Sequence, residues 1–212
     1  MTPGHGTGDA WQSDYSTRGR LWGGNPSPLP PLSPGTRVLE LGCGNGRNLP
    51  GMQSRGWDFT GADHAPEALR LSREAVKGNP GVALVVADAR HLPFRAASFD
   101  AVCAFHVTGH LDNEGRHSLA REVYHVLKDG GEVFVREFGD SDFRFGKGKE
   151  VEEHSFRRGT GTLTHYFSTD ELRDLFGEFT VVSTGEERWS MRVRGRDYPR
   201  CEIVATFRKG NG

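Results

Sequence analysis

From residue 37 onward, short apolar runs alternate with longer segments whose apolar residues recur at helical spacing. The runs of strand length are RVLEL, WDFTGAD, VALVVAD, FDAVCAFHV and KDGGEVFVREF, in that order. Helices are predicted for a segment ending at about residue 55, for PEALRLSREAVKG with Pro66 at its first position, and for about residues 113–127. Alternating strands and helices predict right-handed βαβ units and therefore a mostly parallel sheet with helices on both faces.

The pattern changes toward the C-terminus. VALVVAD is β-branched and lacks polar alternation, which is typical of a strand buried on both faces. After about residue 138, a polar stretch reaches Tyr166, and STDELRDLF then predicts a helix because Ser168 and Glu171 form a capping-box pair. FTVVSTGEE and CEIVATF predict two further strands, which we expect to close the sheet as an antiparallel pair.

The first 35 residues have a different character. Residues 1 to about 9 are rich in Gly and Thr and are expected to be disordered, and residues 23–36 carry five prolines. Such a proline-rich stretch predicts an extended connector, because it can form neither a helix nor a central strand. Between the two, DAWQSDYSTRGRLW predicts one or two helical turns. We therefore expect an N-terminal extension over residues 1–35 and a single domain over residues 36–212.

Composition and charge narrow the possible functions. The longest apolar runs, residues 83–87 and 101–105, fall far short of the roughly 20 residues that a membrane span needs. Three scattered cysteines and the lack of a secretory signal pattern favour a reducing, cytoplasmic location. A net charge of −1 excludes a wholly basic surface, so a nucleic-acid-binding role would need a local patch.

A glycine-rich turn, in the sequence VLELGCGNGRN, follows the first strand and precedes a helix. Gly42, Gly44 and Gly46 allow the backbone to turn tightly and to approach a ligand closely. Arg47 stands where the dinucleotide-binding pattern needs glycine, and a P-loop lysine is absent from the motif. Asp63 ends the second strand, where a carboxylate can bind both ribose hydroxyls of a nucleoside. Taken alone, the turn is also compatible with another Rossmann-like protein.

Asp88 ends the third strand, near the expected position of a nucleoside base. With it, VLELGCGNG, GAD, ADARHLPF, FDAV and LKDGGEVFV follow one another in an order and spacing that resemble the class I S-adenosylmethionine-dependent methyltransferases. The resemblance covers about residues 36–140. It implies an α/β, Rossmann-like fold with a seven-stranded, mostly parallel sheet and an antiparallel C-terminal strand. It also implies methyl transfer from S-adenosyl-L-methionine, which leaves S-adenosyl-L-homocysteine.

The resemblance further implies which residues bind the cofactor. From the methionine end through the ribose to the adenine, the matching positions are Glu40, Gly42, Cys43, Gly44, Asp63, His64, Asp88 and Ala89. Phe105 matches the residue whose carbonyl holds the cofactor's amino group. An aromatic N-terminal segment covers the cofactor in many relatives, which makes Tyr15, Arg20 and Trp22 candidate contacts. The alternative is that these side chains only dock the N-terminus on the domain.

His106 and His110 follow the fourth strand, where this family often places residues that face the methyl acceptor. Either could act as a general base in catalysis, and the alternative is that both are ordinary loop histidines. A four-residue spacing places two side chains on one face only in a helix, and Gly109 follows a strand here. No metal site is therefore expected.

The last third of the chain bears on the acceptor. REFGDSDFRF and RGTGTLTHYFSTDEL, which ends at Leu172, are similar to the eukaryotic methyltransferases that make 3-methylcytidine in tRNA. Those enzymes have additional N-terminal and basic tRNA-binding parts for which this chain has no room. The near-neutral charge therefore makes a small-molecule acceptor the first expectation. A cytidine base of tRNA or a protein side chain is the alternative.

Overall fold

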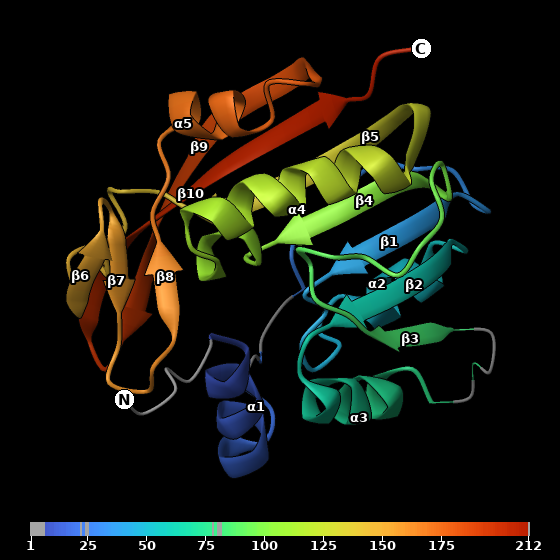
Figure 1. The fold of residues 1–212 in the computed structure, drawn as a ribbon. Coiled ribbons are helices and arrows are strands. Elements are labelled where there is room, and N and C mark those ends of the chain that lie inside the picture. The colour runs from blue at the N-terminus through green and yellow to red at the C-terminus, as the bar shows by residue number, and fades with distance from the viewer. Residues whose placement is uncertain (1–6, 22, 24–25, 78, 80–81, 212) are drawn as a thin grey trace, which may run out of the picture.

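The computed structural model describes residues 7–21, 23, 26–77, 79 and 82–211, which are organised by a seven-stranded sheet (Figure 1). Its strands are β1 (Arg37–Leu41), β2 (Asp58–Asp63), β3 (Ala83–Val86), β4 (Phe99–Phe105), β5 (Leu127–Phe138), β9 (Thr180–Val193) and β10 (Arg196–Arg208). They lie in the order β3-β2-β1-β4-β5-β10-β9. The first five are parallel, and β10 is antiparallel to both β5 and β9. The predicted Rossmann-like sheet is confirmed.

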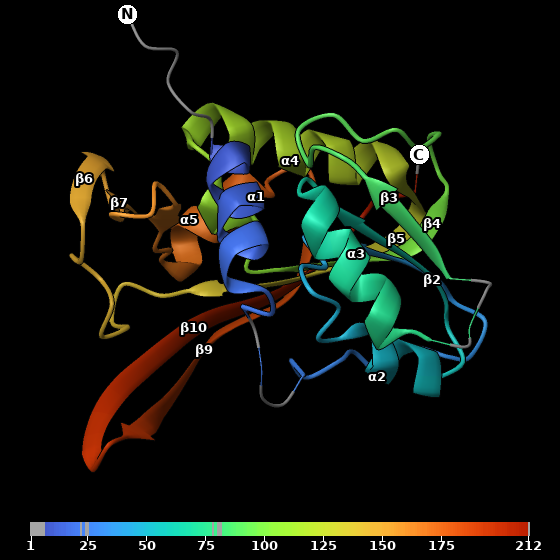
Figure 2. The same cartoon turned by 90° about the horizontal axis from the view of Figure 1, so that it is seen from below.

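Helices cover both faces of this sheet, as Figure 2 shows from below. They are α1 (Thr7–Arg18), α2 (Leu49–Ser54), α3 (Pro66–Ala75), α4 (Asn113–Val126) and α5 (Thr169–Leu175), and a short 3₁₀ turn, η1, spans Thr108–His110. Leu39 belongs to the hydrophobic cluster under α4 and α5, whereas its neighbour Val38 belongs to the cluster under α2 and α3. Alternate residues of β1 thus supply the two halves of the core.

The C-terminal helices begin at the capping residues that the sequence contains. The Asp112 carboxylate accepts the Gly115 N–H at 2.9 Å before α4, and the Ser168 hydroxyl accepts the Glu171 N–H at 3.2 Å before α5. Only half of the predicted capping box forms, because the Glu171 carboxylate instead contacts the His165 imidazole at 2.7 Å. The side chain of Glu171 therefore ties α5 to the strand before it.

Two expectations about individual elements were wrong. β3 is an edge strand that pairs with β2 alone among the described strands, which leaves Val86 56% exposed instead of buried on both faces. The helix after the glycine-rich turn, α2, has six residues and ends at Ser54, close to the expected residue 55. The polar stretch before Tyr166 contains a second, three-stranded antiparallel sheet of β6 (Lys149–Glu152), β7 (Ser155–Arg157) and β8 (Leu163–His165).

The N-terminal segment forms a longer helix than the one or two turns expected, because α1 spans 12 residues. It is anchored by Tyr15, which is 3% exposed and packs against Ala65, Ala68 and Leu71, and by the Gln12 side chain, which accepts a backbone N–H of α3 at 3.1 Å. Disorder was expected for residues 1–9, but residues 7–9 belong to α1, and residues 1–6 lie outside the described residues. The division at residue 35 stays a prediction.

The helices that the structure describes are all too short or too polar to cross a membrane. The cytoplasmic location expected from the sequence stays a prediction.

Candidate active site

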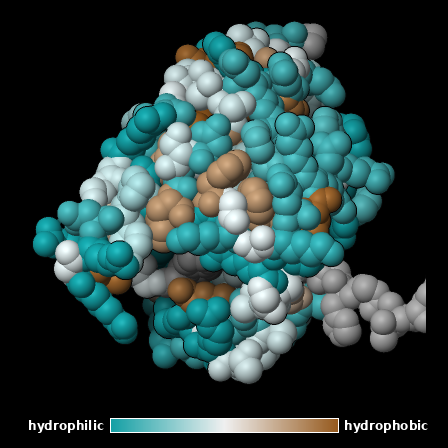
Figure 3. Space-filling view, turned by 90° about the vertical axis from the view of Figure 1, so that its left-hand side faces the viewer, coloured by the Kyte–Doolittle hydropathy of each residue, from teal (hydrophilic) through white to brown (hydrophobic). Residues whose placement is uncertain are grey.

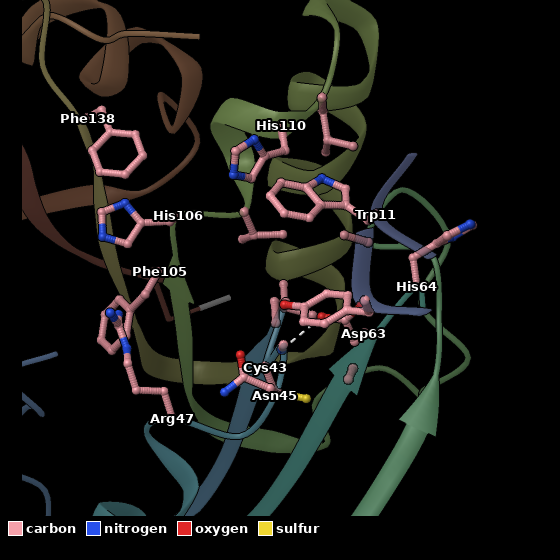
Figure 4. A pocket seen from close by; sticks show the side chains of 18 of the residues that line it. Trp11, Cys43, Asn45, Arg47, Asp63, His64, Phe105, His106, His110 and Phe138 are labelled. Carbon is pink, nitrogen blue, oxygen red and sulfur yellow. Dashed lines mark hydrogen bonds between the residues drawn. The ribbon is translucent and has the colours of Figure 1, made fainter. Parts of the chain in front are cut away.

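A cavity of about 700 Å³ lies where β1, β2 and β4 end. This volume is within the range of about 300–1,000 Å³ that is typical of ligand pockets. Parallel α/β sheets bind their ligands at this carboxyl edge. In the space-filling view a hollow with apolar side chains along its edge separates the lower part, where Figure 1 places α1, from the main body (Figure 3). Figure 4 shows the side chains that line the cavity.

The floor of the cavity is the glycine-rich turn after β1. Gly42 and Gly44 have φ angles of +67° and +58°, which L side chains rarely adopt. A Cβ added to Gly42 would also lie 2.9 Å from the Val107 side chain. Only glycine fits there, and the bare backbone leaves room for a ligand to approach closely.

Asp63 holds this turn in place from the end of β2. Its Oδ2 atom accepts the Gly44 N–H and its Oδ1 atom accepts the Ala65 N–H, both at 2.9 Å (Figure 4). Burial raises the pKa of the carboxyl group, although the backbone hydrogen bonds oppose this change. Each oxygen has a second lone pair. Asp63 can therefore order the turn and also accept hydrogen bonds from ribose hydroxyls.

Two of the predicted cofactor contacts, Glu40 and Arg20, are not among the described residues that line the cavity. Glu40 is buried beneath the turn, where its Oε1 atom accepts a hydrogen bond from the Asn48 amide at 2.7 Å, and burial raises its pKa to about 7. Arg20 instead pairs with Glu74 at 3.8 Å on the surface. Trp22 lies outside the described residues.

The other predicted site residues come together at the cavity. The predicted cofactor contacts in its lining are Tyr15, Gly42, Cys43, Gly44, Asp63, His64, Asp88, Ala89 and Phe105, and the catalytic candidates His106 and His110 line it as well. His64 is exposed and its imidazole points away from the centre (Figure 4). Asp88 is engaged by the Arg90 guanidinium at 2.7 Å, and this hydrogen bond is the main reason that the pKa of Asp88 is lowered. The cofactor and catalytic roles of these residues stay predictions.

His110 forms part of the cavity roof together with α1. Its ring meets the Trp11 indole edge to face, with 4.6 Å between the ring centres (Figure 4). Its Nδ1–H donates to the Leu163 carbonyl at 2.6 Å, and burial lowers its pKa to about 4. A neutral ring whose proton is committed to a backbone carbonyl is suited to positioning Trp11 over the cavity.

His106 is held in an unusual conformation. Its φ angle is +55°, which is rare for a residue other than glycine, and its ring stacks on Phe138 with 4.3 Å between centres. The Nε2 atom lies 3.2 Å from a Glu202 carboxylate oxygen, and the buried Nδ1 atom has no hydrogen-bond partner. Burial lowers the pKa of His106. An unpartnered nitrogen on a cavity-lining imidazole is a candidate contact for a ligand.

Glu202, from β10, fixes this imidazole. Its second carboxylate oxygen binds the Arg136 guanidinium at 2.8 Å. Burial opposes ionisation, but the hydrogen bonds from His106 and Arg136 outweigh it and lower the pKa of Glu202 to about 2. The carboxylate is therefore charged at neutral pH and favours the imidazole form with a proton on Nε2. That form leaves a lone pair on Nδ1.

A second carboxylate holds the loop that carries both histidines. The buried Glu137 Oε1 atom accepts the Val107 and Thr108 N–H groups at 3.0 and 2.7 Å, and burial raises the pKa of Glu137 to about 8. No sequence signal distinguished Glu137 from a strand residue.

We expect Glu137→Ala to lower the free energy of unfolding by about 3 kcal/mol or more, because each buried N–H left without a partner costs about 1–3 kcal/mol. Glu137→Gln keeps an accepting oxygen and is expected to cost less. The raised pKa means that the native state binds the proton more tightly than the unfolded chain. The wild type should therefore lose stability relative to Glu137→Gln as the pH rises from 5 to 8. Urea unfolding at both pH values measures this, and equal losses for Ala and Gln would contradict it.

The far end of the cavity is aromatic and cationic. It is lined by Phe138, Trp189, Arg144, Arg157 and Arg200. The buried Asp142 carboxylate holds Arg144 at 2.8 Å and Arg200 at 2.6 Å. The residues with known positions include no group of three His, Cys, Asp or Glu side chains that could hold a metal. This end of the cavity suits a flat ligand with polar edges.

Comparisons with known proteins identify the class of this site. A family model described as a methyltransferase domain matches residues 38–131. The tRNA N(3)-methylcytidine methyltransferase Mettl2 of Drosophila melanogaster is 29% identical over 81% of this chain and 58% of that protein. The tRNA(Thr) (cytosine(32)-N(3))-methyltransferase of Saccharomyces cerevisiae is 29% identical over 80% of this chain and 30% of that protein. A crystal structure of a Methanosarcina mazei S-adenosylmethionine-dependent methyltransferase superposes with a TM-score of 0.71, at 26% identity over 87% of this chain and 99% of the other.

The fold, together with this match over residues 38–131, is that of a class I S-adenosylmethionine-dependent methyltransferase, as the sequence resemblance implies. S-adenosylmethionine is accordingly its cofactor. The residues present fit this molecule, because the cavity offers a bare glycine backbone that a ligand can approach and a carboxylate, Asp63, that can accept hydrogen bonds from hydroxyl groups. The chain spans only about a third to three fifths of the length of the two tRNA-modifying relatives.

Proposed function

We propose that this chain transfers a methyl group to a ring nitrogen of a cytidine base in RNA, with tRNA as the first candidate. The observation that carries the proposal is the unpartnered Nδ1 of His106, set in a wall of Phe138, Trp189 and Arg200. Aromatic rings and guanidinium planes are the groups on which unpaired bases stack in RNA-binding proteins. The two relatives named for cytosine N3 methylation support the same substrate class.

His106 would read the edge of the base. With Nε2–H donated to Glu202, the Nδ1 lone pair accepts a hydrogen bond from the acceptor. Cytosine presents such a donor, because its N4 amine lies beside the N3 ring nitrogen. Methylation makes the ring cationic and the amine more acidic, and Nδ1 can then receive a proton.

The cofactor supplies the methyl group on an activated sulfonium. The residues of the chain do the positioning, which is the larger part of such a reaction. Gly44 and Asp63 order the binding turn, and Trp11 and His110 cover the cavity and exclude water. His106 and Phe138 hold the acceptor at the opposite wall.

A small-molecule acceptor is the second candidate. It is favoured by the net charge of −1, since RNA-binding proteins usually present an extended basic surface. A cavity of about 700 Å³ could hold a compact heteroaromatic molecule beside the cofactor.

A radiolabelled methyl-transfer assay separates the two candidates. The protein is incubated with labelled S-adenosylmethionine and, in parallel, with unmodified tRNA, with total cell protein and with a small-molecule extract. We expect label in tRNA, recovered after nuclease digestion as 3-methylcytidine. Label confined to the small-molecule fraction would establish the second candidate, and label in protein would overturn both. A Gly44→Val variant serves as the inactive control, because valine disfavours the positive φ of this turn.

A further inference from the structure

A cationic notch opens beside the cavity, between the segment that joins β5 to β6 and the turn that joins β7 to β8. It is lined by Arg144, Lys147 and Arg158 together with Phe143, Gly148 and Gly159. Arg144 lines both the notch and the cavity. Its guanidinium lies 3.8 Å from the centre of the Phe138 ring, whose stacking partner is His106. The notch therefore adjoins the wall at which the acceptor base would lie.

The charges of the notch are only partly neutralised. Arg144 shares the Asp142 carboxylate with Arg200, so one negative charge serves two cations. The described residues in the notch lining include no carboxylate. Lys147 is exposed, and its ammonium lies 4.4 Å from the centre of the Phe143 ring. The local field is therefore positive, although the whole chain is near neutral.

Arg158 has hydrogen-bonding capacity that the protein does not use. Its buried Nε atom has no partner, and one of its terminal nitrogens reaches the Tyr166 hydroxyl at a long 3.4 Å. A buried guanidinium nitrogen without a partner is costly unless a ligand completes it. Burial is the main reason that the pKa of His110 is lowered, and the Leu163 hydrogen bond opposes this change. The positive charges of His106, Arg158 and Arg144 lower the pKa further, so the field of the notch extends into the cavity.

We propose that this notch binds a phosphate group of the methyl acceptor, so that the acceptor base lies against His106 while its phosphate contacts Arg144, Lys147 and Arg158. This inference rests on the proposed function and extends it from a base to a phosphorylated nucleotide. Guanidinium and ammonium groups are the usual partners of phosphate, and their charge-assisted hydrogen bonds are about twice as strong as neutral ones. The phosphate could belong to a free nucleotide or to the RNA backbone.

Equilibrium binding to the protein loaded with S-adenosylhomocysteine tests the site. The probes are cytidine, the cytidine monophosphates with phosphate on either side of the ribose, and a single-stranded oligoribonucleotide containing cytidine. We expect a monophosphate to bind at least about tenfold more tightly than cytidine. Lys147→Ala and Arg158→Ala should each reduce this preference several-fold, and the double variant should abolish it. Lys77→Ala, an equal charge change at an exposed position after α3, should leave it unchanged.

The outcomes distinguish the sources of the phosphate. Tighter binding of the oligoribonucleotide than of any monophosphate, lost with Arg158→Ala, would assign the site to an RNA backbone. Equal affinities for the oligoribonucleotide and the best monophosphate would assign the site to the phosphate of a free nucleotide. The site would be overturned if monophosphates and RNA bound no more tightly than cytidine. It would also be overturned if neither Lys147→Ala nor Arg158→Ala changed their affinity. Lys147 is exposed, so Lys147→Ala remains informative if Arg158→Ala melts early.

The site and the proposed function can also fail separately. Ribose phosphate and ribose contain no base, so their difference in affinity reports on the notch alone. One outcome is that ribose phosphate binds more tightly than ribose, through Arg158, in a protein that methylates no RNA. That result would support the phosphate site and contradict the cytidine acceptor.

Discussion

Replacing His106 with alanine is expected to lower kcat for methyl transfer by about 10²–10⁴, the usual contribution of a positioned acid or base. The reason is that Nδ1 has no hydrogen-bond partner in the protein, whereas Nε2 contacts Glu202, so the proposed function assigns Nδ1 to the acceptor. Affinity for S-adenosylhomocysteine should change little, since Phe138 and Glu202 hold the ring on the acceptor side. Single-turnover kinetics and calorimetry measure the two effects.

Glu202→Gln is the matched variant for this experiment. It keeps a hydrogen-bonding side chain beside His106 but removes the negative charge that favours the protonated ring. The pKa of His106 should therefore fall, and the acidic limb of the pH profile of kcat should move to lower pH. Full activity of His106→Ala would return this histidine to a purely structural role.

Replacing Asp63 with alanine is expected to weaken S-adenosylmethionine binding by one to two orders of magnitude. A hydrogen bond to a charged group contributes about 1.5–3 kcal/mol, and two ribose hydroxyls can share this carboxylate. The substitution also removes the acceptor for the Gly44 and Ala65 N–H groups, so the turn itself should loosen. Calorimetric titration with the cofactor measures the change.

Asp58→Ala is the control for Asp63→Ala, because it removes an exposed carboxylate from the opposite end of β2. Its affinity for the cofactor should match that of the wild type. A folded Asp63→Ala protein that binds S-adenosylmethionine normally would remove Asp63 from the site and leave it as a turn-ordering residue.

The proximity of the predicted cofactor residues could be foreseen from the sequence because these residues directly follow parallel strands. A chain that alternates strands and helices brings the ends of those strands to one edge, so Gly42, Asp63 and Asp88 were expected to be neighbours. His106 was a candidate for the same reason, as the residue that follows β4. The alternation of strands and helices was therefore enough to predict where these residues lie.

The acceptor half could not be predicted, because its side chains come from antiparallel elements with no fixed relation to that edge. Glu202 reaches His106 only through the register of β10, in which Glu202 lies opposite Phe138 of β5. The position of Arg144 depends on a loop before the three-stranded sheet, and the polar sequence of that region did not predict this sheet. Trp11 lies on α1, whose polar sequence shows no continuous apolar face from which docking over the cavity could be inferred.

The placement of β10 between β5 and β9 has a consequence for local opening of the molecule. The turn predicted to bind the cofactor depends on pairings among β1, β2 and β4. β10 takes no part in those pairings, because β5 lies between β4 and β10 in the sheet. A locally opened molecule, with β10 detached, would retain that edge of the sheet but lose the Glu202 partner of His106. The capacity to bind and the capacity to react can therefore be lost separately.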